Sequence, residues 1–209
     1  AERNHFPQEI VKKFGEVGAF GPTLPIEYGC GGLDHISYGL IMQEIERGDS
    51  GMRSTASVQG SLVMYPIYAF GSEAQRKKYL PKLASGEMLG CFGLTEPNHG
   101  SNPSGMETRF VDKGDHYLLN GAKMWISNAP KADVAVVWAK DENDRIHGLI
   151  VERGMEGFST PETHGKWSLR ASCTGELVFS DVKVPKENLL PGKSGLGAPM
   201  KCLDKARYG

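Results

Sequence analysis

The hydrophobic period of the chain changes near residue 89, and this change limits the folds open to it. Before this point, apolar residues recur every three or four positions, which predicts amphipathic helices. The two clearest sets are Ile10, Val11, Phe14 and Val17, and Ile36, Leu40, Ile41 and Ile45. A third helix is expected over residues 72–87, because Ser72 and Gln75 have the spacing of a capping box. Residues 54–70 are expected to be helical up to Pro66, which would end or kink the helix.

After residue 89, short β-rich runs alternate with turn residues, which predicts an all-β module. The expected strands cover residues 89–94, 106–111, 116–119, 123–127, 133–139, 146–152 and 175–184. Asn120-Gly121 is the strongest hairpin signal, and Lys113-Gly114-Asp115 is a second predicted turn. The 27 glycines among 209 residues fit many tight turns. Strands of this number and length favour a small barrel or a sandwich.

The predicted fold class is therefore α+β, with a helical domain followed by a β barrel or sandwich. We expect a helical domain over residues 1–88 and a β domain over 89–192. Helical character returns in MKCLDKARYG, so residues 193–209 are expected to begin a further helical domain.

Composition and short motifs exclude several classes of function. A formal net charge of −1 gives no overall field to recruit nucleic acid or anionic lipid. The four cysteines form no C-x-x-C pair and the histidines lack zinc spacing, so we expect no metal and a reducing compartment. The sequence has no apolar run long enough to span a membrane and no secretory signal at AERNHFPQEI, which predicts a soluble, unexported chain. Pro191-Gly192-Lys193-Ser194 lacks the first glycine of a phosphate loop, and Gly195-Leu-Gly197 lacks the third glycine of a dinucleotide fingerprint.

The segment from Phe92 to Pro103 is the strongest candidate for a ligand site. It reads as a strand running into a loop of small residues, with the hydroxyls of Thr95 and Ser101 among unpaired backbone amides. Such a loop suits a phosphate or the edge of a flavin ring, although a glycine-rich connector has the same composition. Trp125 and Ser127 lie two residues apart on a predicted strand and are expected to share a face. A core ring and a satisfied hydroxyl are the alternative for this pair.

Several blocks, in one order, resemble the acyl-CoA dehydrogenase family. They are LTEPNHGSN, KMWISN and LRASCTGELVFSDVKVPKENLLPG, and the resemblance extends over essentially the whole chain. Within this family, the chain is most similar to glutaryl-CoA dehydrogenases. The blocks that carry this finer resemblance are SGMRSTASVQGSLVMYPIYAFGSEAQRKKYLPKL, CFGLTEPN, METR and CLDKARYG.

The resemblance implies a three-part fold, bound FAD and α,β-dehydrogenation of an acyl-CoA thioester. For a glutaryl enzyme it implies oxidative decarboxylation to crotonyl-CoA, with electrons passing to electron-transfer flavoprotein. It also implies a homotetramer or a dimer, and a place in the mitochondrial matrix or the bacterial cytoplasm. A short-chain dehydrogenase or oxidase on the same scaffold, or a non-catalytic flavin- or acyl-CoA-binding protein, remains an alternative.

Residues that match family motifs carry the implied sites. The implied flavin-binding residues are Phe92, Gly93, Leu94, Thr95, Glu96, Pro97, Asn98, His99, Gly100, Ser101, Trp125, Ile126 and Ser127. The implied substrate-binding residues are Arg53, Ser54, Ser57, Glu46 and Ser101. Arg53 would hold the distal carboxylate of a dicarboxylic thioester, and a surface ion pair with Glu46 or Asp49 is the alternative.

The chain departs from the family pattern in three places and at its ends. Asn102 stands where relatives carry Asp, Ser127 where they usually carry Thr, and His99 where they usually carry a small residue. The catalytic Glu base and the C-terminal bundle are expected beyond Gly209, and the first helices of the fold before Ala1. We therefore expect either a fragment or a short form without the general base.

Overall fold

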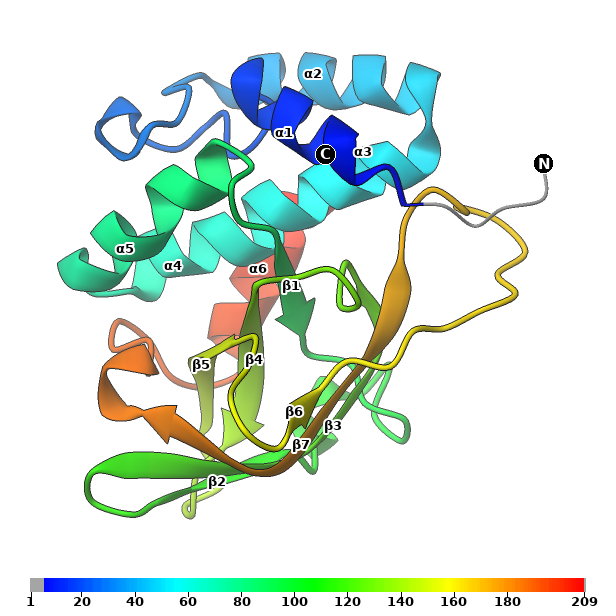
Figure 1. Cartoon of the computed structure of the whole chain (residues 1–209). Helices are drawn as coiled ribbons and strands as arrows, with labels where there is room; N and C mark the ends of the chain where they lie inside the picture. Colours follow the sequence, from blue (N-terminus) through cyan, green and yellow to red (C-terminus); the bar gives the residue numbers. More distant parts are fainter. Residues whose placement is uncertain (1–5, 209) are drawn as a thin grey trace.

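The structure is a computed structural model that describes residues 6–208. A layer of helices lies over a curled β-sheet, and the last helix packs beside both (Figure 1). The helices are α1 (Gln8–Glu16), α2 (His35–Gly48), α3 (Ser50–Ser57), α4 (Tyr65–Phe70), α5 (Glu73–Ala84) and α6 (Gly197–Tyr208), with a π-helical segment, Val58–Met64, joining α3 to α4. Single turns of 3₁₀ helix cover Ile26–Tyr28, Pro103–Gly105 and Lys186–Asn188.

The strands form one mixed, curled sheet. They are β1 (Gly90–Gly93), β2 (Arg109–Asp112), β3 (His116–Ser127), β4 (Val134–Lys140), β5 (Ile146–Glu152), β6 (Phe158–Ser159) and β7 (Thr174–Pro185). The order is β1-β4-β2-β3-β7-β6, and β5 pairs with β4. The pairs β1–β4 and β2–β4 are parallel, and the remaining pairs are antiparallel. The predicted α+β class is confirmed, and the β part is a half-barrel made from one sheet.

The predicted hairpin at Asn120-Gly121 is wrong. Both residues lie inside β3, where the register with β7 shifts between Leu119 and Gly121. The Asn120 side chain donates to Oδ1 of Asp181 at 2.9 Å and accepts from the Asp181 backbone N–H at 2.8 Å. Asn120 and Gly121 therefore form part of a β-bulge in β3, which bends the strand instead of reversing its direction. The predicted turn at Lys113-Gly114-Asp115 does connect β2 to β3.

The helical predictions are correct in position and partly wrong in detail. The capping box is confirmed, since the Ser72 and Gln75 side chains each accept from the other residue's backbone N–H. The helix does not end at Pro66 but continues to Phe70, and this proline follows directly on the π-helical segment, in the first turn of α4. Val17, 77% exposed, does not join the core.

The buried face of α2 matches the prediction only in part, since Ile41 and Ile45 pack against the core. Ile36 and Leu40 are 69% and 59% exposed, whereas Tyr38 and Met42 face the core. Apolar spacing shows that α2 has a coherent stripe but does not say which stripe the tertiary packing covers.

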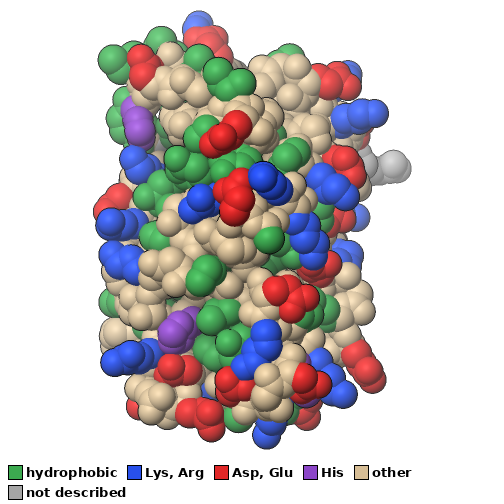
Figure 2. Space-filling view, turned by 90° about the vertical axis from the view of Figure 1, so that its left-hand side faces the viewer, with side chains coloured by type: hydrophobic (Ala, Val, Ile, Leu, Met, Phe, Trp, Pro, Cys, Tyr) green, Lys and Arg blue, Asp and Glu red, His purple; other side chains and the backbone are tan. Residues whose placement is uncertain are grey.

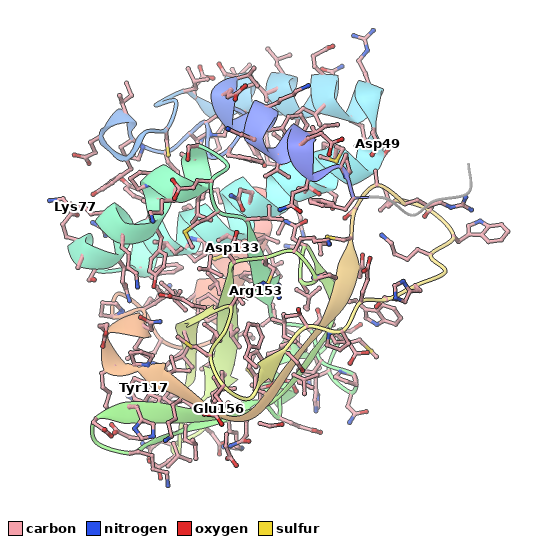
Figure 3. All side chains as sticks on the ribbon, in the orientation of Figure 1. Asp49, Lys77, Tyr117, Asp133, Arg153 and Glu156 are labelled. Atoms are coloured by element: carbon pink, nitrogen blue, oxygen red, sulfur yellow. The ribbon has the colours of Figure 1, made fainter. Side chains whose placement is uncertain are left out.

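Two hydrophobic clusters stabilise the two layers. The larger one joins the helices to one face of the sheet, and the smaller one fills the concave inside of the sheet. Trp138 of β4 is fully buried in the larger cluster, with ring centroids 6.5 Å from Phe70 and 6.2 Å from Phe92. Asp133 and Arg153, labelled in Figure 3, join the start of β4 to the end of β5, since the backbone N–H of Arg153 donates to Asp133 O at 2.8 Å.

The surface carries both signs of charge. On the face in Figure 2, acidic and basic side chains are interspersed with apolar ones, in agreement with the near-zero net charge. Within residues 6–208, no helix has both the length and the apolar character needed to cross a membrane.

A polar contact fixes α5 to the sheet. Oε1 of Glu152 accepts from Lys78 Nζ at 2.7 Å and from the Tyr79 hydroxyl at 2.5 Å. Burial would raise the pKa of Glu152, but the hydrogen bonds from Lys78 and Tyr79 outweigh it and hold this pKa below its ordinary value of 4.5. Burial and the Glu152 hydrogen bond raise the pKa of Tyr79 to about 12. The carboxylate form of Glu152 is therefore the form that the fold stabilises.

Replacing Glu152 by Gln should reduce the pH dependence of stability on the acid side. A lowered pKa contributes stability above the unfolded value near 4.5, and this contribution is lost as pH falls through the folded pKa. We expect E152Q to be about 1 kcal/mol less stable at neutral pH, a small value because the side chain is partly exposed. The difference should vanish in strong acid. Urea unfolding at a series of pH values measures it, with Glu142→Gln on the exposed β4–β5 connection as the control; an equal difference at all pH values would contradict the prediction.

Candidate functional site

A cleft of about 390 Å³ lies between the sheet, the π-helical segment and α6. Three parts of the chain that are distant in sequence form it: the loop after β1, the end of β3, and the two helical segments. Its lining residues are Val58, Leu62, Phe92, Leu94, Thr95, Gly100, Ser101, Pro103, Trp125, Ile126, Ser127, Met200, Leu203 and Arg207. Thus the two segments singled out from the sequence, 92–103 and 123–128, meet in one cleft.

The loop after β1 supplies polar groups to this cleft. Within the described part of the chain, the hydroxyls of Thr95 and Ser101 have no protein hydrogen-bond partner, and neither do the backbone N–H groups of Gly100 and Ser101. Unpaired hydroxyls and backbone donors on a concave surface suit a ligand rich in hydrogen-bonding atoms. The loop is held from behind by a reciprocal pair of backbone hydrogen bonds between Glu96 and His99, each 3.2 Å.

The end of β3 supplies the aromatic wall. Trp125 has a φ of 61° and is 62% exposed, and the register with β7 shifts between Lys123 and Ile126. The strand alternation assumed from sequence is therefore broken by a β-bulge at the tryptophan. Trp125 and Ser127 nevertheless both line the cleft, and Ile126 between them does too.

A buried ion pair lies directly behind these two walls. Nζ of Lys123 is 2.8 Å from Oε1 of Glu96, and the two side chains are 0% and 3% exposed. Burial lowers the pKa of Lys123 to about 8, although the Glu96 carboxylate opposes this shift. Burial would raise the pKa of Glu96, but the Lys123 ammonium and the Glu107 backbone N–H hold it below its ordinary value.

The helical wall contains residues that sequence reasoning missed. Val58 and Leu62 come from the π-helical segment, and Met200, Leu203 and Arg207 come from α6. The spacing of three and four in the last set places them on one helix face, and this pattern was a usable signal. Because Arg207 is one of the lining residues, a guanidinium borders the cleft. Its side chain is 69% exposed, and its Nη1 lies 3.2 Å from Oδ1 of Asp204.

Four of the predicted substrate residues lie apart from this cleft, Glu46 on α2 and Arg53, Ser54 and Ser57 on α3. Nε of Arg53 donates to Oε2 of Glu46 at 2.8 Å, and the Ser50 hydroxyl donates to Oε1 at 2.5 Å. These two hydrogen bonds, Ser50 first, keep the pKa of Glu46 below its ordinary value. Ser57 lies one turn after Arg53 and contacts Ala206 O of α6 at 3.5 Å. Arg53, Ser54, Ser57 and Glu46 do not line the 390 Å³ cleft itself.

Five of the predicted flavin residues also lie outside the cleft lining. They are Gly93, Glu96, Pro97, Asn98 and His99. Glu96 is buried behind the loop, Pro97 and Asn98 are exposed, and His99 lies 3.3 Å from Glu107. Asn102, one of the three departures from the family pattern, accepts a hydrogen bond from Ser104 at 2.5 Å through its side-chain oxygen.

Comparison with known proteins decides the family. The acyl-CoA dehydrogenase N-terminal domain matches residues 1–87, and the acyl-CoA dehydrogenase middle domain matches residues 91–182. The chain belongs to the acyl-CoA dehydrogenase family. The order of the two matches agrees with helices followed by a sheet.

Individual acyl-CoA dehydrogenases are similar over nearly the whole chain. A glutaryl-CoA dehydrogenase of Desulfococcus multivorans is 46% identical over 93% of this chain and 52% of its own length. A short-chain-specific acyl-CoA dehydrogenase of Clostridium acetobutylicum is 41% identical over 100% of this chain and 56% of its own. A crystal structure of a glutaryl-CoA dehydrogenase from Mycobacterium smegmatis in complex with FADH2 superimposes with a TM-score of 0.95 at 51% identity, covering 98% of this chain and 52% of that one. The chain thus spans about half the length of the relatives it matches.

Proposed function

We propose that this chain provides the flavin and acyl-thioester half-sites of an FAD-dependent acyl-CoA dehydrogenase. The single observation that carries this proposal is the cleft in which Thr95, Ser127 and the exposed ring of Trp125 meet. We further propose helical, β and second helical domains over residues 1–88, 89–192 and 193–209.

The residues of the cleft fit an isoalloxazine ring system. The Trp125 ring offers a flat surface for stacking, and the hydroxyls of Thr95 and Ser127 can donate to ring heteroatoms. Gly100 and Ser101 would hold phosphate oxygens through backbone N–H groups. Phe92, Leu94 and Ile126 would exclude water from one side. The chemistry that FAD supplies when bound is acceptance of the hydride that leaves the β-carbon of the acyl chain.

The proposed substrate is glutaryl-CoA, which would lose CO₂ to give crotonyl-CoA. Glu46 holds Arg53 through Nε, and no partner of the two terminal guanidinium nitrogens is found within residues 6–208. An arginine held in this way can grip a carboxylate with two parallel hydrogen bonds. Arg207 offers a further cationic group for the phosphates of the CoA arm.

The wider context is proposed from the family. The partners would be electron-transfer flavoprotein and further copies of the chain in a homotetramer, in the mitochondrial matrix or a bacterial cytoplasm. The similarity to a short-chain-specific dehydrogenase makes butyryl-CoA the competing substrate.

Binding of FAD by the intact gene product tests the proposed function. We expect Trp125→Ala to weaken FAD binding about tenfold, since aromatic stacking with shielding from water is worth about 1.4 kcal/mol. Trp167→Ala is the matched control, because this tryptophan is 92% exposed and lies outside the cleft. Equilibrium dialysis with flavin absorbance measures both. Absence of FAD binding to the wild type, or equal effects of the two substitutions, would overturn the proposal.

A further inference from the structure

We propose that Lys123 and Glu96 are positioning residues, which lock the hydroxyl loop and the tryptophan strand together in the geometry that holds the flavin. This inference rests on the proposed function and extends it to a pair that does not touch the cleft. Neither side chain lines the cleft, and each belongs to a segment that does.

Every contact of the pair involves a segment that forms or flanks the cleft wall. Lys123 Nζ donates to Leu94 O at 3.1 Å and to Glu96 Oε1 at 2.8 Å. The carboxylate of Glu96 accepts from the backbone N–H of Thr108 at 3.0 Å and of Glu107 at 2.6 Å. One buried cluster therefore joins the loop after β1, the approach to β2 and the end of β3.

The pair is adjacent in sequence to the residues proposed to contact flavin. Thr95 lies between Leu94, whose carbonyl Lys123 holds, and Glu96. Its own carbonyl accepts from the Met124 backbone N–H at 2.9 Å. Thr95 and Trp125 are thus tied to one another through residues 123 and 124, and a shift of either segment would move both.

The backbone at Trp125 shows why such a tie is needed. A φ of 61° is costly for a bulky residue and persists only where the surrounding structure imposes it. From Lys123 to Ile126, β3 moves by three residues, whereas the paired stretch of β7, from Leu177 to Gly175, moves by only two. This bulge lets Lys123 point into the protein while Trp125, two residues later, faces the cleft.

Stability alone does not account for the pair. Burying two charges costs desolvation, and apolar side chains of similar volume often stabilise a core as well or better. An ion pair specifies direction, because its hydrogen bonds fix which atoms meet. The Lys123–Glu96 pair is therefore suited to fixing the loop after β1 relative to the end of β3, at the place where flavin would bind.

The test compares variants with different chemistry but a similar loss of stability, each made in the intact gene product. Lys123→Met removes the ammonium and keeps a chain of similar length. Leu149→Ala, a fully buried position in the cluster inside the sheet, is the stability-matched control. We expect Lys123→Met to weaken FAD binding about tenfold or more and to change the visible circular dichroism of bound flavin. Leu149→Ala should bind FAD within about twofold of the wild type at a comparable loss of thermal stability.

Two further variants secure the result. Glu96→Gln is nearly isosteric and should also weaken FAD binding, and it carries the test if Lys123→Met does not fold. The double variant should bind FAD no more weakly than Lys123→Met alone, because the two residues act as one unit. Wild-type affinity and flavin spectrum in a folded Glu96→Gln or Lys123→Met variant, or equal losses of FAD affinity in Leu149→Ala, would refute the positioning role. If the wild type binds FAD, such a result refutes the positioning role alone and leaves the proposed function standing. If the wild type does not bind FAD, both the proposed function and the positioning role are refuted.

Discussion

Replacing Arg53 by Ala is expected to lower kcat/KM for glutaryl-CoA about 100-fold in the intact gene product. Loss of a paired, charge-assisted contact to a carboxylate costs about 3 kcal/mol, and each 1.4 kcal/mol is about a factor of ten. Butyryl-CoA, which has no distal carboxylate, should be affected less than about threefold. The measurement is steady-state turnover of both thioesters with an artificial electron acceptor, in air and without oxygen, so that oxidase activity is also detected.

The neighbouring Arg47 provides the matched control for this experiment. It lies on α2, is paired with Glu44 at 3.0 Å and has a side chain that is 72% exposed. Such surface pairs contribute little, so Arg47→Ala should leave both substrates unchanged. A wild type that prefers butyryl-CoA, or an Arg53→Ala variant that loses both substrates equally, would contradict the assignment of Arg53 to the distal carboxylate.

Replacing Gln59 by Leu is expected to lower the free energy of unfolding by about 3–5 kcal/mol. Its amide nitrogen donates to Leu83 O at 3.0 Å and to Met88 O at 2.8 Å, and its oxygen accepts from Gly90 N at 2.8 Å. Gln59 is fully buried, so leucine would leave Met88 O and Gly90 N–H without partners in a region without access to water, and Leu83 O with only the backbone of the α5 terminus, including Gly86 N–H at 3.4 Å. These groups join the π-helical segment to the end of α5 and the start of β1.

Denaturant unfolding measures this effect, with Gln43→Leu as the control. Gln43 is exposed on α2, where the same substitution should change stability by less than about 0.5 kcal/mol. A loss below about 1 kcal/mol in Gln59→Leu would show that Met88 O and Gly90 N–H find other partners.

Periodicity predicted the positions of the elements well because the spacing of apolar residues is a local property of the sequence. The capping box at Ser72 and Gln75 and the change to β structure near residue 89 depend on nearby residues, and both are present. The hairpin at Asn120 failed because a partner 61 residues away, Asp181, uses the same amide. Sequence spacing carries no information about that partner.

The residues of the candidate site also fall into those that local sequence predicted and those that it did not. The loop after β1 and the tryptophan strand are contiguous motifs, and their residues were recognisable as chemistry-bearing. Lys123 was not, because a lysine is normally exposed and only the folded structure shows it to be fully buried beside Glu96. The spacing of Met200, Leu203 and Arg207 shows that they share a face of α6, but only the packing of α6 beside the π-helical segment brings that face to the cleft.

The three tryptophans occupy three different environments, and this gives the protein an internal set of optical reporters. Trp138 is enclosed at the seam between helices and sheet, Trp125 stands in the cleft, and Trp167 extends into solvent. Emission from the enclosed indole should shift to longer wavelength only when the two layers separate. Quenching confined to the cleft indole would instead signal an occupant, so single-tryptophan versions of this chain can follow unfolding and ligand entry as independent events.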